Sequence, residues 1–208
     1  MLFPVHPQNP EKRKIKQISE KLLEGAVYIF PTDTVYAIAA DATSVKAIDK
    51  FNAIRNNIEN QPLTLLCKDI SEASNYIVQF SNEAFKIMKH CTPGPYIFLI
   101  KANKNVSKST LVNPKTRTLG IRISENIFLR DLLEFHPNPI IMASVVLEHE
   151  FIEEPEMIDS LLGKKVEAVV DGGRLVTELT TIIDFQDDVP VIIREGKGMD
   201  RLVGFNIG

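Results

Sequence analysis

Residues 25–36 read Gly-Ala-Val-Tyr-Ile-Phe-Pro-Thr-Asp-Thr-Val-Tyr, an apolar run that stops at a proline and continues with three small polar residues. The run from Ala26 to Phe30 contains β-formers without polar alternation, which is typical of a strand covered on both faces. Pro31 cannot donate to a neighbouring strand, so it ends the strand and begins a turn. Thr32 to Thr34 then lie at the carboxyl end of a strand, where open α/β sheets bind ligands. An ordinary strand, turn and capped helix start explains this segment equally well.

The composition is that of an ordinary globular protein. The chain has 208 residues, of which 44% are hydrophobic and 25% charged, and we expect a single domain over residues 1–208 because no repeat or linker is visible. No apolar run reaches the roughly 18 residues that span a membrane, and no signal peptide is visible. Cys67 and Cys91 give neither a disulfide framework nor zinc spacing, so we expect a cytoplasmic protein. The net charge of −3 argues against a generally basic nucleic-acid binder but permits a local basic cleft.

The hydrophobic pattern predicts about seven strands interleaved with about five helices, which form a twisted mixed sheet with helices on its faces. Gly25 is expected to stop a first helix, and Ser44, Ser81 and Asn126 to begin others. Helical periodicity predicts that a set of apolar residues faces the core. This set includes Leu23, Val45, Phe85, Met157 and Leu161.

Several kinds of site are excluded by their missing motifs. The sequence has no phosphate loop, no G-x-G-x-x-G after a strand and no G-x-S-x-G elbow. The four histidines lie far apart in sequence, so we expect solvated or capping residues rather than metal ligands. They are His6, His90, His136 and His149. Residues 171–173, Asp-Gly-Gly, are most simply a turn that ends a strand.

What remains is a set of arginines and hydroxyl side chains at strand ends. An arginine within an apolar strand, such as Arg122 or Arg194, is costly to bury unless it pairs with a carboxylate or faces an anionic ligand. Singly, each could pair with Asp33, Asp171 or Asp184. As a set they indicate a cleft for an anionic ligand. The set is Thr32, Thr34, Arg55, Arg122, Ser144, Thr180, Thr181 and Arg194.

These residues lie in segments that resemble the YrdC-like family, the threonylcarbamoyl-AMP synthases. The resemblance extends from about residue 5 to 200. Within the family the sequence is most similar to the YciO subgroup, because it shares His-Pro-Gln-Asn-Pro at 6–10 and Thr-Leu-Leu-Cys at 64–67. The segments are 25–36, 55–63, 92–98, 119–123, 144, 171–173, 180–184 and 193–196.

The resemblance implies a twisted mixed parallel and antiparallel sheet with a basic concave face. It implies a reaction that converts L-threonine, bicarbonate and ATP, with Mg²⁺ on the phosphates, into threonylcarbamoyl-AMP and pyrophosphate for tRNA modification. Such chemistry requires positioning and charge neutralisation rather than a protein nucleophile or a resident metal.

The same resemblance assigns roles to individual residues. Thr32, Thr34 and Tyr36 would line the threonine end of the site, Arg122 would clamp a carboxylate or bicarbonate, and Thr180 would complete the substrate-binding set. The nucleotide would be contacted by Arg55, Ser144 and Arg194.

Three positions depart from the family pattern. Asn57 replaces the second cation of Lys-x-Arg, Val146 replaces the amide residue of Ser-x-Asn, and Leu66 replaces the histidine that usually follows the Pro-Leu strand start. Losing one charged phosphate contact costs about 1.5–3 kcal/mol, or one to two decades in affinity. We therefore expect a divergent family member whose ATP binding is weakened. The alternative is a module that binds double-stranded RNA or tRNA without turning over ATP, with an affinity that falls steeply as salt rises.

Overall fold

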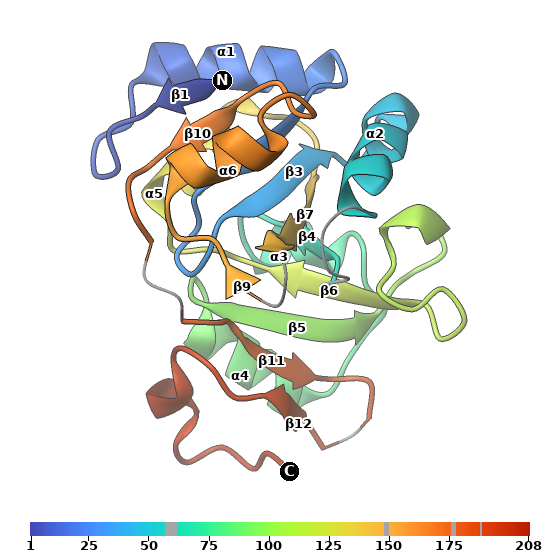
Figure 1. Cartoon of the computed structure of the whole chain (residues 1–208). Coiled ribbons are helices and arrows are strands. Elements are labelled where there is room, and N and C mark those ends of the chain that lie inside the picture. Colours follow the sequence, from blue (N-terminus) through green and yellow to red (C-terminus); the bar gives the residue numbers. More distant parts are fainter. Residues whose placement is uncertain (57–61, 148–149, 176–177, 188) are drawn as a thin grey trace. The chain divides into compact units, whose positions relative to one another are not determined.

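The computed structural model describes residues 1–56, 62–147, 150–175, 178–187 and 189–208 (Figure 1). The chain forms two compact units, each made of two separate segments: residues 1–62 with 126–177, and residues 63–125 with 178–208. Asn57 and His149, which the sequence analysis singled out, lie outside the described residues. The single domain over residues 1–208 stays a prediction.

The first unit is built on a mixed sheet. Strands β1, β10 and β2 are parallel, and β3 is antiparallel to both β2 and β7. The carboxyl ends of β10, β2 and β7 therefore share one edge of this sheet with the start of β3. The strands lie in the order β1 (Leu2–Pro4), β10 (Val169–Asp171), β2 (Val27–Phe30), β3 (Ala37–Asp41) and β7 (Ile140–Ser144).

Helices pack on this sheet through their apolar stripes. Helix α1 (Lys12–Leu23) packs against α5 (Ile127–Phe135), α2 (Val45–Arg55) against β2 and β3, and α6 (Pro155–Leu162) against β1 and β10. A small hairpin joins β8 (Val146–Leu147) to β9 (Glu150–Phe151). Gly25 follows α1 with φ +90°, a conformation that suits glycine and confirms the predicted helix stop.

The second unit has its own run of paired strands. β4 is parallel to β6, β5 is antiparallel to β6 and parallel to β11, and β11 pairs with β12 in an antiparallel hairpin. The predicted mixed α/β sheet is thus confirmed. The strands are β4 (Thr64–Leu66), β6 (Thr118–Arg122), β5 (Tyr96–Lys101), β11 (Thr181–Asp184) and β12 (Val191–Arg194). The helical elements are α3 (Ile70–Ser74), α4 (Asn82–Cys91) and the 3₁₀ turns η1 (Lys108–Thr110) and η2 (Met199–Leu202).

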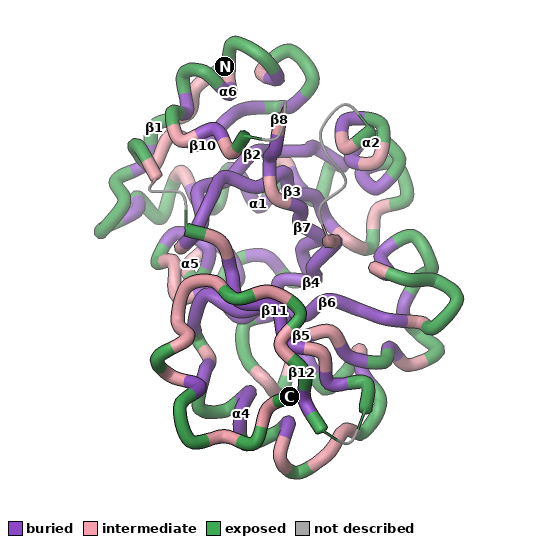
Figure 2. The backbone as a smooth tube through the Cα atoms, turned by 60° about the horizontal axis from the view of Figure 1, so that its bottom comes forward, coloured by how far each residue is buried: buried purple, intermediate pink, exposed green. Residues whose placement is uncertain are grey.

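The buried residues lie mostly in the strands. Figure 2 shows the strands as mostly buried, with exposure concentrated in the loops and on the outer faces of the helices. β2 and β3 are buried at every position, as expected for strands covered on both faces. Within the described ranges, no helix combines the length and apolar character needed to cross a membrane.

The described residues contain twelve strands and six α-helices, more than the seven and five predicted. The main omission is β3, whose sequence Ala-Ile-Ala-Ala-Asp is poor in β-formers and is a strand because of its pairing on both sides. Helix α3 begins at Ile70 with Asp69 as its N-cap. The segment after Glu195 packs η2 against α4 and buries Leu202.

Five apolar residues predicted to face the core are exposed. In α6 the buried residues are Pro155, Ile158 and Leu162. Ile158 and Leu162 lie one position after the exposed Met157 and Leu161. Such a shift of one residue rotates a helical face by about 100°, which periodicity alone does not fix in a short helix. The exposed fractions are 48% for Leu23, 74% for Val45, 45% for Phe85, 56% for Met157 and 50% for Leu161.

Candidate substrate and nucleotide site

In the first unit the predicted hydroxyl residues lie in the loop of residues 31–36, which joins β2 to β3. Thr32 Oγ1 accepts a hydrogen bond from the Thr34 backbone N–H at 3.0 Å and donates to the Val35 carbonyl at 2.7 Å. The two threonine hydroxyl oxygens lie 3.1 Å apart, and both side chains are buried. The Thr32 hydroxyl thus donates its proton within the loop, so Thr32 fixes the loop's shape rather than donating to a ligand.

Tyr36 ties this loop to the turn that follows β10. Its hydroxyl donates to the Gly173 carbonyl at 2.7 Å and accepts from the Gly172 N–H at 3.3 Å. The ring is fully buried, and burial raises the pKa of the phenol. A Cβ on Gly172 would lie 2.7 Å from Pro31 Cγ, so glycine permits the two turns to touch. The sequence assigned Tyr36 to the substrate, but its hydroxyl holds the neighbouring turn in place.

Ser144 lies at the same sheet edge. It is the last residue of β7 and pairs with Ala37, and the Val145 N–H donates to the Tyr36 carbonyl at 2.9 Å. Ser144 is half-buried. Val146, the position that departs from the family pattern, is buried in β8 opposite Phe151. The apolar side chain is therefore part of the packing of this hairpin.

Arg55 ends α2, the helix that follows β3 and packs back on it. A cation in the last turn of a helix interacts favourably with the helix dipole. The guanidinium is half-buried, and burial lowers its pKa, although an arginine in a protein keeps its charge.

In the second unit the predicted residues Arg122, Thr180 and Arg194 meet at one edge. β6 and β12 end there, with Arg122 and Arg194 as their last residues, and β11 begins there just after Thr180. Arg194 Nε donates to the Thr180 carbonyl at 3.0 Å, and a terminal nitrogen donates to the Thr180 hydroxyl at 2.7 Å. The structure thus brings these three predicted residues together at one edge, and their role in a site stays a prediction.

The two arginines repel each other electrostatically. Arg122 is 3% exposed. The pKa of Arg194 is lowered by burial and, secondly, by the positive charge of Arg122. Arg194 donates to neutral oxygens of Thr180, and neighbouring guanidinium groups suit a carboxylate or a phosphate as ligand.

Thr181 makes two hydrogen bonds to the segment that follows Arg194. Thr181 Oγ1 donates to the Lys197 carbonyl at 2.9 Å and accepts from the Gly196 N–H at 3.1 Å. A Cβ on Gly196 would lie 2.3 Å from the Leu179 carbonyl oxygen. Thr181, which the sequence placed in the site, therefore holds the segment after Arg194, and Gly196 is a supporting residue that the strand-end pattern did not indicate.

The predicted residues form two groups. The first unit brings together Thr32, Thr34, Tyr36 and Ser144 at one sheet edge, and the second unit brings together Arg122, Thr180 and Arg194.

Across the described ranges, no group of three His, Cys, Asp or Glu side chains could hold a metal ion.

His136 is the C-cap residue of α5, one of the two roles predicted for the histidines, but it is buried rather than solvated. It is 4% exposed, with Nε2 3.3 Å from Asp41 Oδ2 and Nδ1 3.1 Å from Ser19 Oγ. His136 follows α5, Asp41 ends β3 and Ser19 is in α1, so the three are close only in the fold. Sequence spacing gave no signal for this buried polar cluster.

Comparison with known proteins gives the family. Residues 20–196 match the Sua5/YciO/YrdC family, which carries the description "Telomere recombination". The chain is 38% identical to the Escherichia coli protein YciO, described as uncharacterized, over 198 residues that cover 94% of this chain and 95% of YciO. The crystal structure of E. coli YciO matches with a TM-score of 0.87 at 36% identity, over 95% of this chain and 96% of that chain.

More distant relatives carry a named activity. A Methanocaldococcus jannaschii protein named putative threonylcarbamoyl-AMP synthase is 28% identical over 201 residues, covering 94% of this chain and 92% of the relative. The structure of P. abyssi Sua5 complexed with L-threonine matches with a TM-score of 0.87 at 21% identity, over 100% of this chain and 62% of that chain; at that identity the likeness shows the fold. By its sequence and its fold, this chain belongs to the Sua5/YciO/YrdC family.

Proposed function

We propose that this chain is a nucleotidyltransferase of the threonylcarbamoyl-AMP synthase type, which joins L-threonine, bicarbonate and the AMP part of ATP. The observation that carries the proposal is the pair of buried or half-buried arginines, Arg122 and Arg194, whose charges lie close together beside Thr180. Relatives named threonylcarbamoyl-AMP synthase and the L-threonine complex of P. abyssi Sua5 support the choice of reaction.

The reaction has two bond-forming steps. The threonine amine attacks the carbon of bicarbonate, water leaves, and a carbamate forms. A carbamate oxygen then attacks the α-phosphorus of ATP, and the bond from that phosphorus to the bridging oxygen breaks, which releases pyrophosphate. Both steps concentrate negative charge, so fixed cations and fixed hydrogen-bond donors lower the barrier without a protein nucleophile.

Each group of residues has a part in this proposal. Arg122 and Arg194 would bind carboxylate or phosphate oxygens, because a guanidinium presents two parallel donors to either anion. Thr32, Thr34 and Tyr36 would hold the loop of residues 31–36 in the shape that receives the amino acid. Arg55 and Ser144 would contact the nucleotide.

Mg²⁺ would come to this site with ATP. The ion retains several waters and binds through one or two carboxylates together with substrate phosphates. Asp33 lies in the loop of residues 31–36 and Asp171 ends β10, so two carboxylates lie at this edge of the first unit. This donor set fits a nucleotide-borne ion whose charge neutralises the phosphates.

The proposal is tested by measuring pyrophosphate release from ATP with and without L-threonine and bicarbonate, with the adenylate product identified by mass spectrometry. Arg194→Gln should lower turnover about ten- to a hundredfold, because one charged contact to the substrate is worth about 1.5–3 kcal/mol. Arg174→Gln is the matched control, since Arg174 is exposed and pairs with Glu153. The synthase proposal fails if pyrophosphate release does not depend on threonine, or if Arg174→Gln and Arg194→Gln reduce it equally.

A second candidate is RNA binding without ATP turnover, favoured by the loop that joins β5 to β6. Residues 101–117 carry five cations and no acidic residue in a chain whose net charge is −3. Arg117 braces this loop by donating to the carbonyls of Asn103 and Val106. A fixed row of cations neutralises a phosphate backbone and releases its counterions. The cations are Lys101, Lys104, Lys108, Lys115 and Arg117.

This second candidate predicts a steep salt dependence. Binding of an RNA hairpin should weaken by orders of magnitude between 50 and 200 mM salt, as expected when several phosphates are neutralised. Changing Lys104, Lys108 and Lys115 together to Gln should flatten that slope. Changing Lys12, Arg13 and Lys16 to Gln is the control, because it removes three exposed charges from α1. Equal loss of RNA binding in both triple variants would contradict a role for the loop.

A further inference from the structure

A cavity of about 290 Å³ lies in the second unit, away from every predicted site residue. It opens where the parallel strands β5 and β11 end, between Lys101 and the residues after Asp184. Arg122, Thr180 and Arg194 lie at the opposite ends of these strands, where β5 and β11 begin. The carboxyl ends of parallel strands are where α/β proteins bind ligands, so the cavity is a second candidate binding site.

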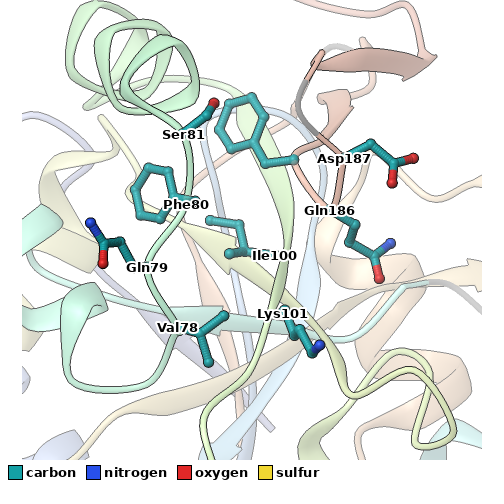
Figure 3. Close-up of a pocket in the computed structure, with 9 residues that line it drawn as sticks. Val78, Gln79, Phe80, Ser81, Ile100, Lys101, Gln186 and Asp187 are labelled. Carbon is teal, nitrogen blue, oxygen red and sulfur yellow. The ribbon is translucent and has the colours of Figure 1, made fainter.

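Stacked aromatic rings form part of the apolar lining of the cavity. Figure 3 shows Phe80 and Ile100 among the lining residues. The rings of Phe80 and Phe185 are stacked, with centroids 6.3 Å apart and planes 12° apart, and Phe185 stacks on Phe98 at 5.2 Å. A half-buried ring held by such stacking offers a fixed surface to the ring of a ligand.

The polar wall is also held in place. The Thr118 hydroxyl donates to Gln186 Oε1 at 2.7 Å, and Gln186 Nε2 donates to Asp184 Oδ2 at 2.9 Å. The Gln186 backbone N–H donates to Asp184 Oδ1 at 2.8 Å. The wall therefore needs little reorganisation on binding, which favours affinity.

The cavity has charges of both signs. Lys101 and Asp187 both line the cavity, and Gln186 lies between them in Figure 3. A phosphate would be attracted by Lys101 and repelled by Asp187, whereas a zwitterion would satisfy both. The volume is at the lower end of that of small-molecule sites.

We propose that this cavity binds a zwitterionic amino acid with an aromatic side chain. Its ring packs against Phe80, its carboxylate meets the Lys101 ammonium, and its ammonium meets the Asp187 carboxylate. The site is separate from the arginine edge, and its existence does not depend on the proposed synthase reaction.

L-tryptophan is a suitable probe, because the chain contains no tryptophan and the fluorescence of the probe can be read without background. Equilibrium dialysis in the absence of ATP should show saturable binding of L-tryptophan to the full chain. Two analogues separate the charges: 3-indolepropionate lacks the amine and tryptamine lacks the carboxylate.

Each charge-removing variant should weaken only the ligands that carry the opposite charge. Lys101→Met should weaken L-tryptophan and 3-indolepropionate roughly tenfold and leave tryptamine unchanged, whereas Asp187→Asn should weaken L-tryptophan and tryptamine and leave 3-indolepropionate unchanged. Phe80→Leu should weaken all three. Lys104→Met and Asp200→Asn are the controls, because both charges are exposed and neither lines the cavity.

Two results would overturn the proposal. One is the absence of saturable binding up to the solubility of L-tryptophan. The other is binding that Lys101→Met or Asp187→Asn weakens equally for all three ligands, or that the control variants weaken as much. Because the assay contains no ATP, failure of the synthase reaction would leave these outcomes unaffected.

Discussion

The buried Asp41 carboxylate should be one of the largest single polar contributions to the stability of the first unit. It is 1% exposed and accepts hydrogen bonds from the Thr43 N–H and hydroxyl, both at 2.7 Å, and from Asn138 Nδ2 at 2.8 Å. His136 Nε2 lies 3.3 Å away, and Ser19 contacts the other ring nitrogen. The change Asp41→Asn keeps the volume of the side chain but turns one acceptor oxygen into a donor that faces other donors.

The magnitude follows from the burial of the group. Removing one partner of a buried pair costs about 3–5 kcal/mol, and the oxygen that Asn retains offsets part of this, so we expect a loss of about 3 kcal/mol at neutral pH. Burial alone raises the pKa of Asp41, but interactions with His136, Asn138 and Thr43 outweigh it and hold the pKa below its usual value. A carboxyl whose pKa is lower in the folded state stabilises the fold above its unfolded pKa, and this stabilisation is lost as pH falls.

Urea unfolding followed by far-UV circular dichroism between pH 7 and pH 2 measures both the loss of stability and its dependence on pH. Below pH 3.8, the ordinary pKa of an aspartate side chain, the free energy of unfolding of the wild type should fall more steeply than that of Asp41→Asn. Asp49→Asn is the control, since Asp49 is exposed on α2 and should change stability by less than about 0.5 kcal/mol. The reasoning is refuted if Asp41→Asn costs no more than Asp49→Asn, or if its stability has the same pH slope as that of the wild type.

Three further changes probe the edge that carries the loop of residues 31–36. Tyr36→Phe should cost about 1–3 kcal/mol and speed amide exchange at Gly172, since its N–H loses the phenol oxygen as acceptor; unchanged exchange would contradict this contact. Gly172→Ala should lower the melting temperature through overpacking worth about 1–3 kcal/mol, because its Cβ would meet Pro31; an unshifted melt would argue against that contact. Val146→Asn should cost about 1–3 kcal/mol by burying an amide, whereas tighter ATP binding without loss of stability would show that the position faces the nucleotide.

The parts of the fold that could be predicted are those where local chemistry and tertiary context agree. The run from Val27 to Phe30 has β-formers, a glycine before it and a proline after it, so propensity, pattern and turn chemistry indicate one strand. Ser44, Ser81 and Asn126 are N-caps in the structure as predicted, because a side-chain oxygen that accepts from a helix N–H is a local interaction.

The parts that could not be predicted depend on partners distant in sequence. β3 is a strand because β2 and β7 pair with it on either side, which its alanines do not reveal. The cluster of Asp41, His136 and Ser19 joins three elements over 117 residues of sequence, so no spacing rule finds it. The same holds for the roles of hydroxyls: Thr32 and Thr181 were recognised as important, but their hydrogen bonds to Val35 and Lys197 are visible only in the fold.

These hydrogen bonds change how the candidate site is understood. A resemblance places threonines and a tyrosine at the substrate, and it is natural to assign their hydroxyls to ligand contacts. In the structure the hydroxyls of Thr32 and Tyr36 donate to backbone carbonyls, so they shape the loop. In the proposed reaction, Arg122 and Arg194 would supply the charge that an anionic substrate needs. If loop shape and arginine charge are separable, Tyr36→Phe should weaken the selectivity for the amino acid, and Arg194→Gln should weaken the affinity for every anionic substrate alike. Competition between L-threonine and L-serine in the pyrophosphate assay distinguishes the two effects, and a loss of selectivity in Arg194→Gln equal to that in Tyr36→Phe would contradict this division.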